Sequence, residues 1–249
     1  AGGAARPIGD GRVAAMTSFS FHPVKTIAMG EGGAVTTNDG RLADRLRRLR
    51  AHGMVRDAAL LQNAELAFDA DGKVNPWYYE MPEIGLNYRV TDIQCALGLS
   101  QMKKLGRFVA RRAALADRYD RQVAALAPLV RPVARSAAAL PAWHIYPLLI
   151  DFAVAGVSRA EVMEGLKAAG IGSQVHYIPV HLQPYYRRRY GALTLPGAER
   201  YYARTLSLPL FAAMAESDVD RAVEALTKVL RNSGAAPASG MRRSAQGGA

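Results

Sequence analysis

Lys25 stands in a short loop between two apolar segments, within the stretch SFSFHPVKTIAMGEGGAVTTND (residues 18–39). A lysine that forms a Schiff base must lose its proton, and burial between apolar walls favours that neutral state. Ser18 and Ser20 precede it with hydroxyls that can hydrogen-bond a phosphate, and the Gly-Glu-Gly-Gly turn after it lets the backbone approach a ligand closely. The same pattern fits a structural lysine whose ammonium reaches solvent, so the local sequence leaves both interpretations open.

The composition is typical of a folded protein with one large domain or two small ones. Of the 249 residues, 50% are hydrophobic and 21% are charged, which excludes wholesale disorder. No apolar run has the length of a membrane span, and the first residues lack the order of a signal peptide, so we expect a cytoplasmic protein with no membrane partner. The single cysteine, Cys95, excludes a disulfide framework and a multi-cysteine metal site, and we predict no metal.

The net charge of +11 raises the possibility of nucleic-acid binding. The arginines, however, are distributed over separate segments, with clusters at 45–50, 111–112 and 187–189. No helix-turn-helix signature or repeated base-stacking motif accompanies them. We therefore interpret them as charges on solvated helix faces and predict no nucleic-acid partner. A substrate that carries phosphates would use only a few of them.

Strands and helices alternate along the chain, which predicts an α/β fold. Strands are expected at 15–21, 33–37, 143–151 and 173–180. Helices are expected from 39 to 53, from 91 to about 125, from 158 to 170, near 196–205, and after a cap at Ser217. Capping-box matches begin the second and third of these helices, and Gly106 is expected to bend or split the second. Its expected buried face comprises Ile93, Leu97, Leu105, Phe108, Leu115 and Tyr119.

The segment around Lys25 resembles the region of the cofactor lysine in the DegT-type sugar-nucleotide aminotransferases, which are fold-type I pyridoxal phosphate (PLP) enzymes. The resemblance continues through Leu46–Gly53, GLNYRVTDIQCALGLSQMKKL and VHYIPVH, and covers residues 7 to about 230. It implies the α/β fold of that class. Residues 1–127 would be the C-terminal part of the PLP-binding large domain with a long connecting helix, 128–231 the small α/β domain, and 232–249 a disordered tail.

The resemblance also implies roles for individual residues. Lys25 would bond to PLP and later move the proton, and Ser20 would hold the cofactor phosphate. Asn87 would reach the phosphate of the partner subunit's cofactor, which implies a homodimer with shared active sites. Three further residues fall in the segment near the sugar nucleotide: His176, Tyr177 and His181. For the two histidines, a place at the edge of a pocket with no substrate contact stays open.

Within the family, residues 75–112 most resemble the members that aminate a UDP-linked 4-keto-6-deoxy-N-acetyl sugar in pseudaminic acid biosynthesis. The implied reaction moves an amino group from an amino-acid donor, glutamate, to the 4-keto carbon. Aminotransferases for other keto-sugar nucleotides stay open, and so does a noncatalytic derivative of the fold. Related sugar dehydratases carry histidine in place of the lysine, so Lys25 argues against that class.

Family members also have a phosphate loop, an aspartate that pairs with the pyridine nitrogen and a histidine that packs on the cofactor ring, all upstream of the lysine. Nothing in residues 1–249 matches these parts. We therefore expect a C-terminal fragment of such an enzyme or a partial gene model. We also expect that residues 1–249 alone have no transaminase activity.

Overall fold

The computed structural model describes residues 6–232, which divide into two compact units between Leu105 and Gly106. The sequence predicted a division after residue 127. The observed division lies earlier because helix α4 (Leu105–Val123) buries Leu115 and Tyr119 completely in the core of the C-terminal unit. Beyond Asn232, the predicted tail lies outside the described residues.

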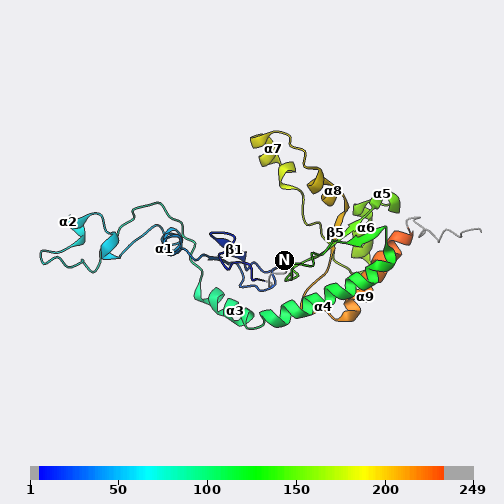
Figure 1. Ribbon diagram of the computed structural model, residues 1–249, viewed down its shortest axis with the longest axis horizontal. Coiled ribbons are helices and arrows are strands. Elements are labelled where there is room, and N and C mark those ends of the chain that lie inside the picture. Colours follow the sequence, from blue (N-terminus) through cyan, green and yellow to red (C-terminus); the bar gives the residue numbers. More distant parts are fainter. Residues whose placement is uncertain (1–5, 233–249) are drawn as a thin grey trace, which may run out of the picture. The chain divides into compact units, whose positions relative to one another are not determined.

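The N-terminal unit begins with an antiparallel pair of strands, β1 (Thr17–Ser20) and β2 (Gly33–Thr36), which confirms both predicted strands (Figure 1). Residues 6–16 before them form turns, as the glycine-rich sequence indicates. The weakly alternating sequence of residues 15–21 suits a buried strand, but the structure contradicts that expectation. The alternate residues of β1 are exposed and all of β2 is exposed, since within this unit only two strands form the sheet.

Helical segments and a long irregular stretch complete this unit. Asp39 caps α1 (Gly40–Leu49) by accepting hydrogen bonds from two backbone N–H groups, and Thr91 begins α3 (Asp92–Met102) with the predicted capping box. The stretch between them contains only short elements, η1 (Ala58–Leu60) and α2 (Ala64–Ala67). Residues 54–90, whose sequence shows little periodicity, thus form a long irregular segment, as that sequence predicts.

The helix expected from residue 91 to about 125 is two helices, α3 and α4. The break falls at Lys103 and Lys104, two residues before Gly106, which lies inside α4. The predicted buried face is correct for Leu115 and Tyr119 of α4, whereas Leu105 and Phe108 are only half-buried. It is wrong in α3, where Ile93 is 84% exposed and Leu97 is 45% exposed. The reason is that α3 belongs to the N-terminal unit, and in its described part only four apolar residues are buried and none lies in α3.

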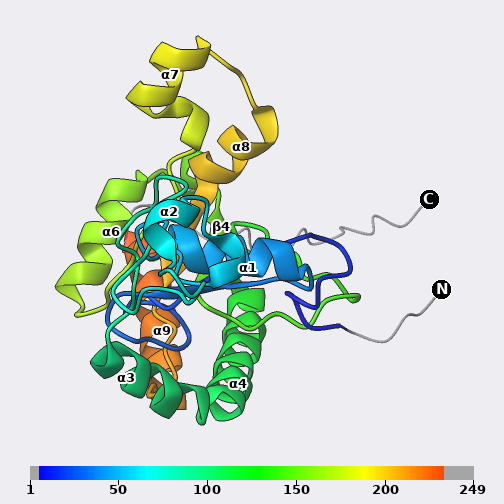
Figure 2. The ribbon, with the colours of Figure 1, turned by 90° about the vertical axis from the view of Figure 1, so that its left-hand side faces the viewer.

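The C-terminal unit is a three-stranded antiparallel sheet covered by helices. The strand order is β3 (Val130–Pro132), β4 (Tyr146–Ile150) and β5 (Thr205–Leu208). Three helices supply the other side of the core: α4, α6 (Arg159–Ala168) and α9 (Glu216–Asn232). Shorter elements connect them: η2 (Ala124–Leu126), α5 (Phe152–Ala155), η3 (Val180–Leu182), α7 (Pro184–Tyr190) and α8 (Pro196–Arg204). Figure 2 shows α6 and α9 beside each other in this unit.

Two local predictions for this unit are wrong. Residues 173–180 form no strand: only Gln174 pairs, with Ser207, and Pro179 has no N–H to donate to a ladder. Helix α9 begins at Glu216, one residue before the expected cap. There the Asp218 carboxylate accepts the N–H of Ala215 at 2.9 Å instead.

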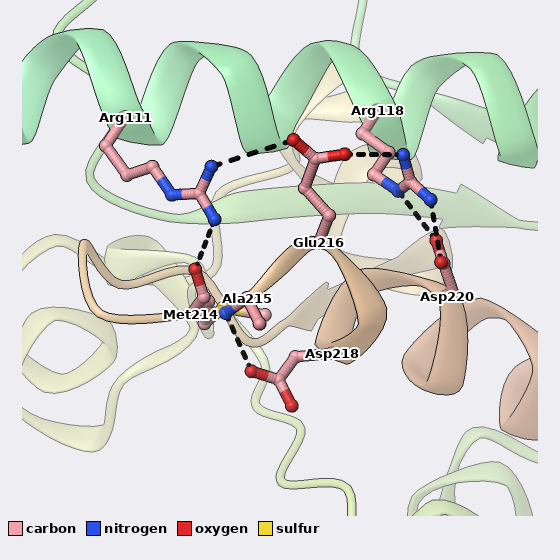
Figure 3. Close-up of polar contacts among 7 residues, drawn as sticks. All are labelled: Arg111, Arg118, Met214, Ala215, Glu216, Asp218 and Asp220. Atoms are coloured by element: carbon pink, nitrogen blue, oxygen red, sulfur yellow. Dashed lines mark hydrogen bonds and ion pairs between the residues drawn. The ribbon is translucent and has the colours of Figure 1, made fainter.

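Ion pairs join α4 to α9 (Figure 3). Arg118 donates through Nε and Nη2 to both carboxylate oxygens of Asp220 at 2.7 Å, and through Nη1 to Glu216 at 2.7 Å. These hydrogen bonds, with one from Gln122, lower the pKa of Asp220 to about 2. Arg118 thus holds α4 and α9 together from a partly solvated helix face.

Arg112 departs from that interpretation because it is buried, with 6% exposure. Its Nη1 donates to the carbonyl oxygens of His144 and Leu210 at 3.0 and 2.7 Å, and burial lowers the pKa of its guanidinium. This arginine therefore connects α4 to the residues just before β4 and just after β5. Among residues 6–232, no helix is long and apolar enough to cross a membrane.

Candidate functional site

Lys25 lies in a loop that its own backbone closes. The N–H of Phe21 donates to the Gly32 carbonyl at 2.9 Å, and the Phe21 carbonyl accepts from Met29 at 3.0 Å, so residues 22–28 leave and re-enter the end of the hairpin. Inside the loop, the Lys25 N–H donates to the His22 carbonyl at 2.9 Å. The Lys25 side chain is half-buried. The loop therefore fixes the backbone of Lys25 near the end of β1.

Ser20 is the last residue of β1 and adjoins the base of this loop. It lies on the exposed face of the strand together with Ser18, and its partner on β2 is Gly33, which has no side chain to cover it. The Ser20 oxygen accepts from the His22 N–H at 3.4 Å, so its own O–H is left to donate. A Cβ at position 33 would lie 2.6 Å from the Phe19 carbonyl oxygen, which explains the glycine.

This arrangement fits PLP, which needs an amine and hydrogen-bond donors for its phosphate. Lys25 supplies the amine and Ser20 a hydroxyl from the base of the same closed loop. Gly30 has a φ of +82°, and nothing lies within 4 Å of the position where a Cβ would be, so the backbone there is open to a ligand. The donor set is thus the one that a phosphate-bearing aldehyde requires.

Asn87 lies in a segment that pairs with the end of α1. Its neighbours Leu86 and Tyr88 donate their N–H groups to the carbonyls of Leu49 and Arg50 at 2.7 and 2.9 Å. Asn87 itself is exposed. The backbone is therefore fixed while the amide side chain stays available for a ligand or a partner.

Two glycines permit this pairing. A Cβ at Gly53, whose φ is +73°, would lie 1.9 Å from the Glu83 carbonyl oxygen, and one at Gly85 would lie 2.1 Å from the Gly53 nitrogen. The Glu83 carboxylate also accepts from Arg45 and Arg48 at 3.2 Å. The sequence had indicated Gly53 as the end of a helix, but not that it makes the close approach that holds Asn87.

Glu80 organises the irregular stretch and was missed in the sequence. Its carboxylate accepts from the N–H groups of Gln62 and Asn63 at 2.7 and 2.8 Å and from the Tyr78 hydroxyl at 2.9 Å. The Asn63 and Gln62 hydrogen bonds lower the pKa of Glu80. The signal that could have found it is the long segment without helix or strand, whose backbone donors need side-chain acceptors.

The three residues predicted near the sugar nucleotide lie in the C-terminal unit. His176 Nδ1 is 2.9 Å from the Ser207 hydroxyl on β5, and the rings of His176 and Tyr177 meet edge to face with centroids 4.7 Å apart. Tyr177 is 63% exposed. His181 is buried and its Nε2 lies 3.0 Å from Glu199. Tyr177 is thus the most accessible of the three.

Glu199, which the sequence analysis did not single out, closes a projecting segment. Its carboxylate accepts from the Leu195 N–H at 2.8 Å and pairs with His181, and these bonds lower its pKa. Residues 182–195 therefore leave the rest of the unit and return to it at one point, the Glu199 carboxylate. His181 acts here as a positioning residue for that segment.

The chain belongs to the DegT/DnrJ/EryC1/StrS aminotransferase family, whose profile matches residues 4–227. This is a family of PLP-dependent sugar aminotransferases, as the resemblance predicted. The spore coat polysaccharide biosynthesis protein SpsC of Bacillus subtilis is 38% identical over 224 residues, which are 89% of this chain and 55% of SpsC. The chain thus spans about half the length of the curated relatives that it matches.

Solved structures confirm the predicted fold-type I class. Helicobacter pylori PseC, an aminotransferase involved in the biosynthesis of pseudaminic acid, matches with a TM-score of 0.75 and 30% identity over 88% of this chain and 54% of PseC. Spr1654 of Streptococcus pneumoniae in its PMP form matches with a TM-score of 0.76 and 28% identity over 90% of this chain and 55% of that one. DesI with its TDP-sugar product matches with a TM-score of 0.71 and 29% identity over 90% and 52%.

Proposed function

We propose that the protein works as a cytoplasmic PLP-dependent aminotransferase that converts a UDP-linked 4-keto-6-deoxy-N-acetyl sugar into the 4-amino sugar, with glutamate as amino donor. The observation that carries this proposal is the closed loop that holds Lys25 beside the Ser20 hydroxyl. The pseudaminic acid step is supported by the similarity to PseC and by residues 75–112. A role in surface glycan synthesis is also consistent with the similarity to SpsC.

The residues of this chain divide the work between binding and proton transfer. Ser20 would donate a hydrogen bond from its hydroxyl to the cofactor phosphate. The backbone turn at residues 30–33 leaves room for that phosphate. Lys25 would hold the cofactor through its amine and, as a free amine, would carry a proton to or from C4 of the sugar. When bound, PLP supplies the electron sink that stabilises negative charge at the carbon that loses the proton.

We propose that each active site is shared by two subunits of a homodimer, with Lys25 from one and Asn87 from the other. Two observations support this. The Asn87 segment is fixed by backbone pairing while the side chain is exposed, and its neighbours Leu86 and Tyr88 are 54% and 73% exposed. Apolar side chains that flank a fixed polar one are typical of a protein-binding surface.

The proposed reaction is tested with the protein expressed from its complete gene, incubated with PLP, glutamate and candidate UDP-linked 4-keto sugars. We expect a UDP-4-amino sugar, identified by mass spectrometry and NMR, and no product from Lys25→Ala. The matched control is Lys73→Ala, an exposed lysine in the same unit, which should keep full activity. A product that is equally abundant with Lys25→Ala would contradict the assignment.

The shared site is tested by mixing. A Lys25→Ala chain and an Asn87→Ala chain should regenerate one intact site per heterodimer, because the other site receives both lesions. Activity should therefore rise after subunit exchange above the mean of the two variants alone. If heterodimers form, as native mass spectrometry would show, and activity does not rise, Asn87 does not act across the subunits.

A further inference from the structure

Residues 182–195, here called the α7 arm, carry a positive charge that nothing nearby neutralises. No Asp or Glu occurs between Glu164 and Glu199, whereas Arg187, Arg188 and Arg189 follow one another in α7. Among residues 6–232, no carboxylate lies within ion-pair distance of these three arginines. Arg118 and Arg135 of the same unit, by contrast, are each paired with two acidic side chains. The arm is therefore a cationic surface available to an anion.

The geometry of a helix places the tyrosines of α7 together. At about 100° per residue, Tyr185, Tyr186, Arg189 and Tyr190 fall within an arc of about 140°, and Arg187 and Arg188 lie about 60° beyond its two edges. The ring centroids of Tyr186 and Tyr190 are 6.3 Å apart and nearly parallel. The exposed fractions of Tyr185, Tyr186 and Tyr190 are 55%, 40% and 59%. One exposed face thus combines the three aromatic rings with the Arg189 guanidinium, and Arg187 and Arg188 flank this face on its two sides.

Arg189 is held in place by neutral groups. Its Nε donates to the Tyr190 hydroxyl at 3.1 Å, and its Nη1 lies 3.5 Å from the Tyr185 hydroxyl. Its guanidinium carbon is 5.5 Å from the centroid of the Tyr190 ring. Phenol oxygens orient the guanidinium without cancelling its charge, so its planar fork can still bind a phosphate through two parallel hydrogen bonds.

The arm stands on the segment that contains the predicted substrate residues. Helix α7 contacts η3, which includes His181, and the pair of His181 and Glu199 closes the base of the arm. Figure 2 shows α7 projecting from the C-terminal unit next to α8. Helix α7 is therefore joined through η3 to the segment that contains the predicted substrate residues.

We propose that the α7 arm binds the nucleoside diphosphate part of the sugar nucleotide. Arg189 and the flanking Arg187 and Arg188 would contact the two phosphates, and an exposed tyrosine would stack on the base. A helix of seven residues is about 10 Å long, which suits one nucleoside diphosphate better than a nucleic-acid strand. This assignment rests on the proposed function, which gives the substrate as a nucleotide-linked sugar.

The test is isothermal titration of UDP into the protein expressed from its complete gene. The change is the combined substitution Arg187→Gln, Arg188→Gln and Arg189→Gln. Because one charge-assisted hydrogen bond to phosphate contributes about 1.5–3 kcal/mol, the Kd for UDP should rise at least about tenfold. Inorganic pyrophosphate should compete with UDP in the wild type and not in the variant. Tyr186→Leu should weaken the binding of uridine and of UDP and leave the binding of pyrophosphate unchanged.

The matched control removes exposed arginines of the same unit, by Arg121→Gln with Arg231→Gln, and should leave the Kd for UDP unchanged. Circular dichroism confirms that each variant is folded. The proposal is overturned if wild type does not bind UDP, if the arginine substitutions leave its Kd unchanged, or if a single-stranded oligonucleotide binds the arm more tightly than UDP. Covalent labelling of Lys25 by PLP reports on the proposed function separately, since the arm substitutions should not change it.

Discussion

The two units differ in how they are held together. In the C-terminal unit, residues of three strands and three helices form one fully buried core, including Leu115, Leu166 and Leu206. In the described part of the N-terminal unit, the buried apolar residues are Ile27, Met29, Val55 and Ala67. Large apolar side chains are instead exposed there, among them Trp77 at 73% and Ile84 at 86%.

The difference teaches where the stability and the chemistry of this chain lie. The C-terminal unit has the core of an independent domain. The N-terminal unit holds Lys25, Ser20 and Asn87 by backbone pairing and by the carboxylates of Glu80 and Glu83, with almost no core beneath them. Its exposed apolar surface is the kind that further protein covers, and the proposed dimer is one source.

The largest expected effect comes from the core. Leu115→Ala should lower the free energy of unfolding of the C-terminal unit by about 2–5 kcal/mol, because it leaves a cavity among fully buried residues. Leu97→Ala, in the 45% exposed position of α3, should change it by less than about 0.5 kcal/mol. Urea titration read from Trp143, which packs on this core, in a Trp77→Phe background would separate the two. Equal losses would mean that the units share one core.

Ser20→Ala should act on the cofactor and not on the fold. Loss of a hydrogen bond to the charged phosphate is worth about 1.5–3 kcal/mol, so the Kd for PLP should rise roughly ten- to hundredfold in the complete gene product. The unfolding transition read from Trp143 should stay unchanged. Ser18→Ala, two residues earlier on the same exposed face of β1, serves as the comparison. An unchanged Kd for PLP would show that Ser20 does not bind the phosphate.

The two capping boxes provide a matched pair, one in each unit. Ser158→Ala should destabilise the C-terminal unit by about 1 kcal/mol, since α6 contributes to its core. Thr91→Ala removes the same kind of cap from α3 but should leave that transition in place and only speed hydrogen exchange at the start of α3. A shift of the Trp143 transition by Thr91→Ala would break the proposed independence of the units.

The smallest effect is a pH dependence. The hydrogen bonds from Arg118 and Gln122 hold the pKa of Asp220 at about 2, below its ordinary value of 3.8. For a carboxylate with a lowered pKa, the stabilisation is complete above the ordinary value and is lost as the pH falls through the lowered one. Urea midpoints of the wild type should therefore fall more steeply between pH 4 and pH 2 than those of Asp220→Asn. Parallel curves would show that the pair does not stabilise the fold.

The sequence predicted the elements whose signals are local. The capping boxes at Thr91 and Ser158, the cap at Asp39 and the strand expected at 143–151 follow from neighbouring residues alone. They are present, the strand with the shorter bounds Tyr146–Ile150. The family was also predictable, because its motif around Lys25 is a continuous string.

Features that depend on distant residues were not predictable. The apolar period of Ile93 and Leu97 indicated a buried face, but burial requires a partner surface that the N-terminal unit does not provide. The interhelical role of Arg118 and the burial of Arg112 depend on α9 and on loops about 100 residues away. For the same reason, no local signal indicates the hydrogen bond of Glu80 with Gln62 or that of Glu199 with His181.

The proposal that Lys25 holds PLP is tested most directly by reduction of the complete gene product with borohydride after incubation with PLP. The account predicts a visible absorbance band that disappears on reduction and a covalent label that peptide mapping places on Lys25. Lys25→Ala should show neither the band nor the label, while Lys73→Ala should show both. A label on another lysine, or an unchanged band in Lys25→Ala, would contradict the account.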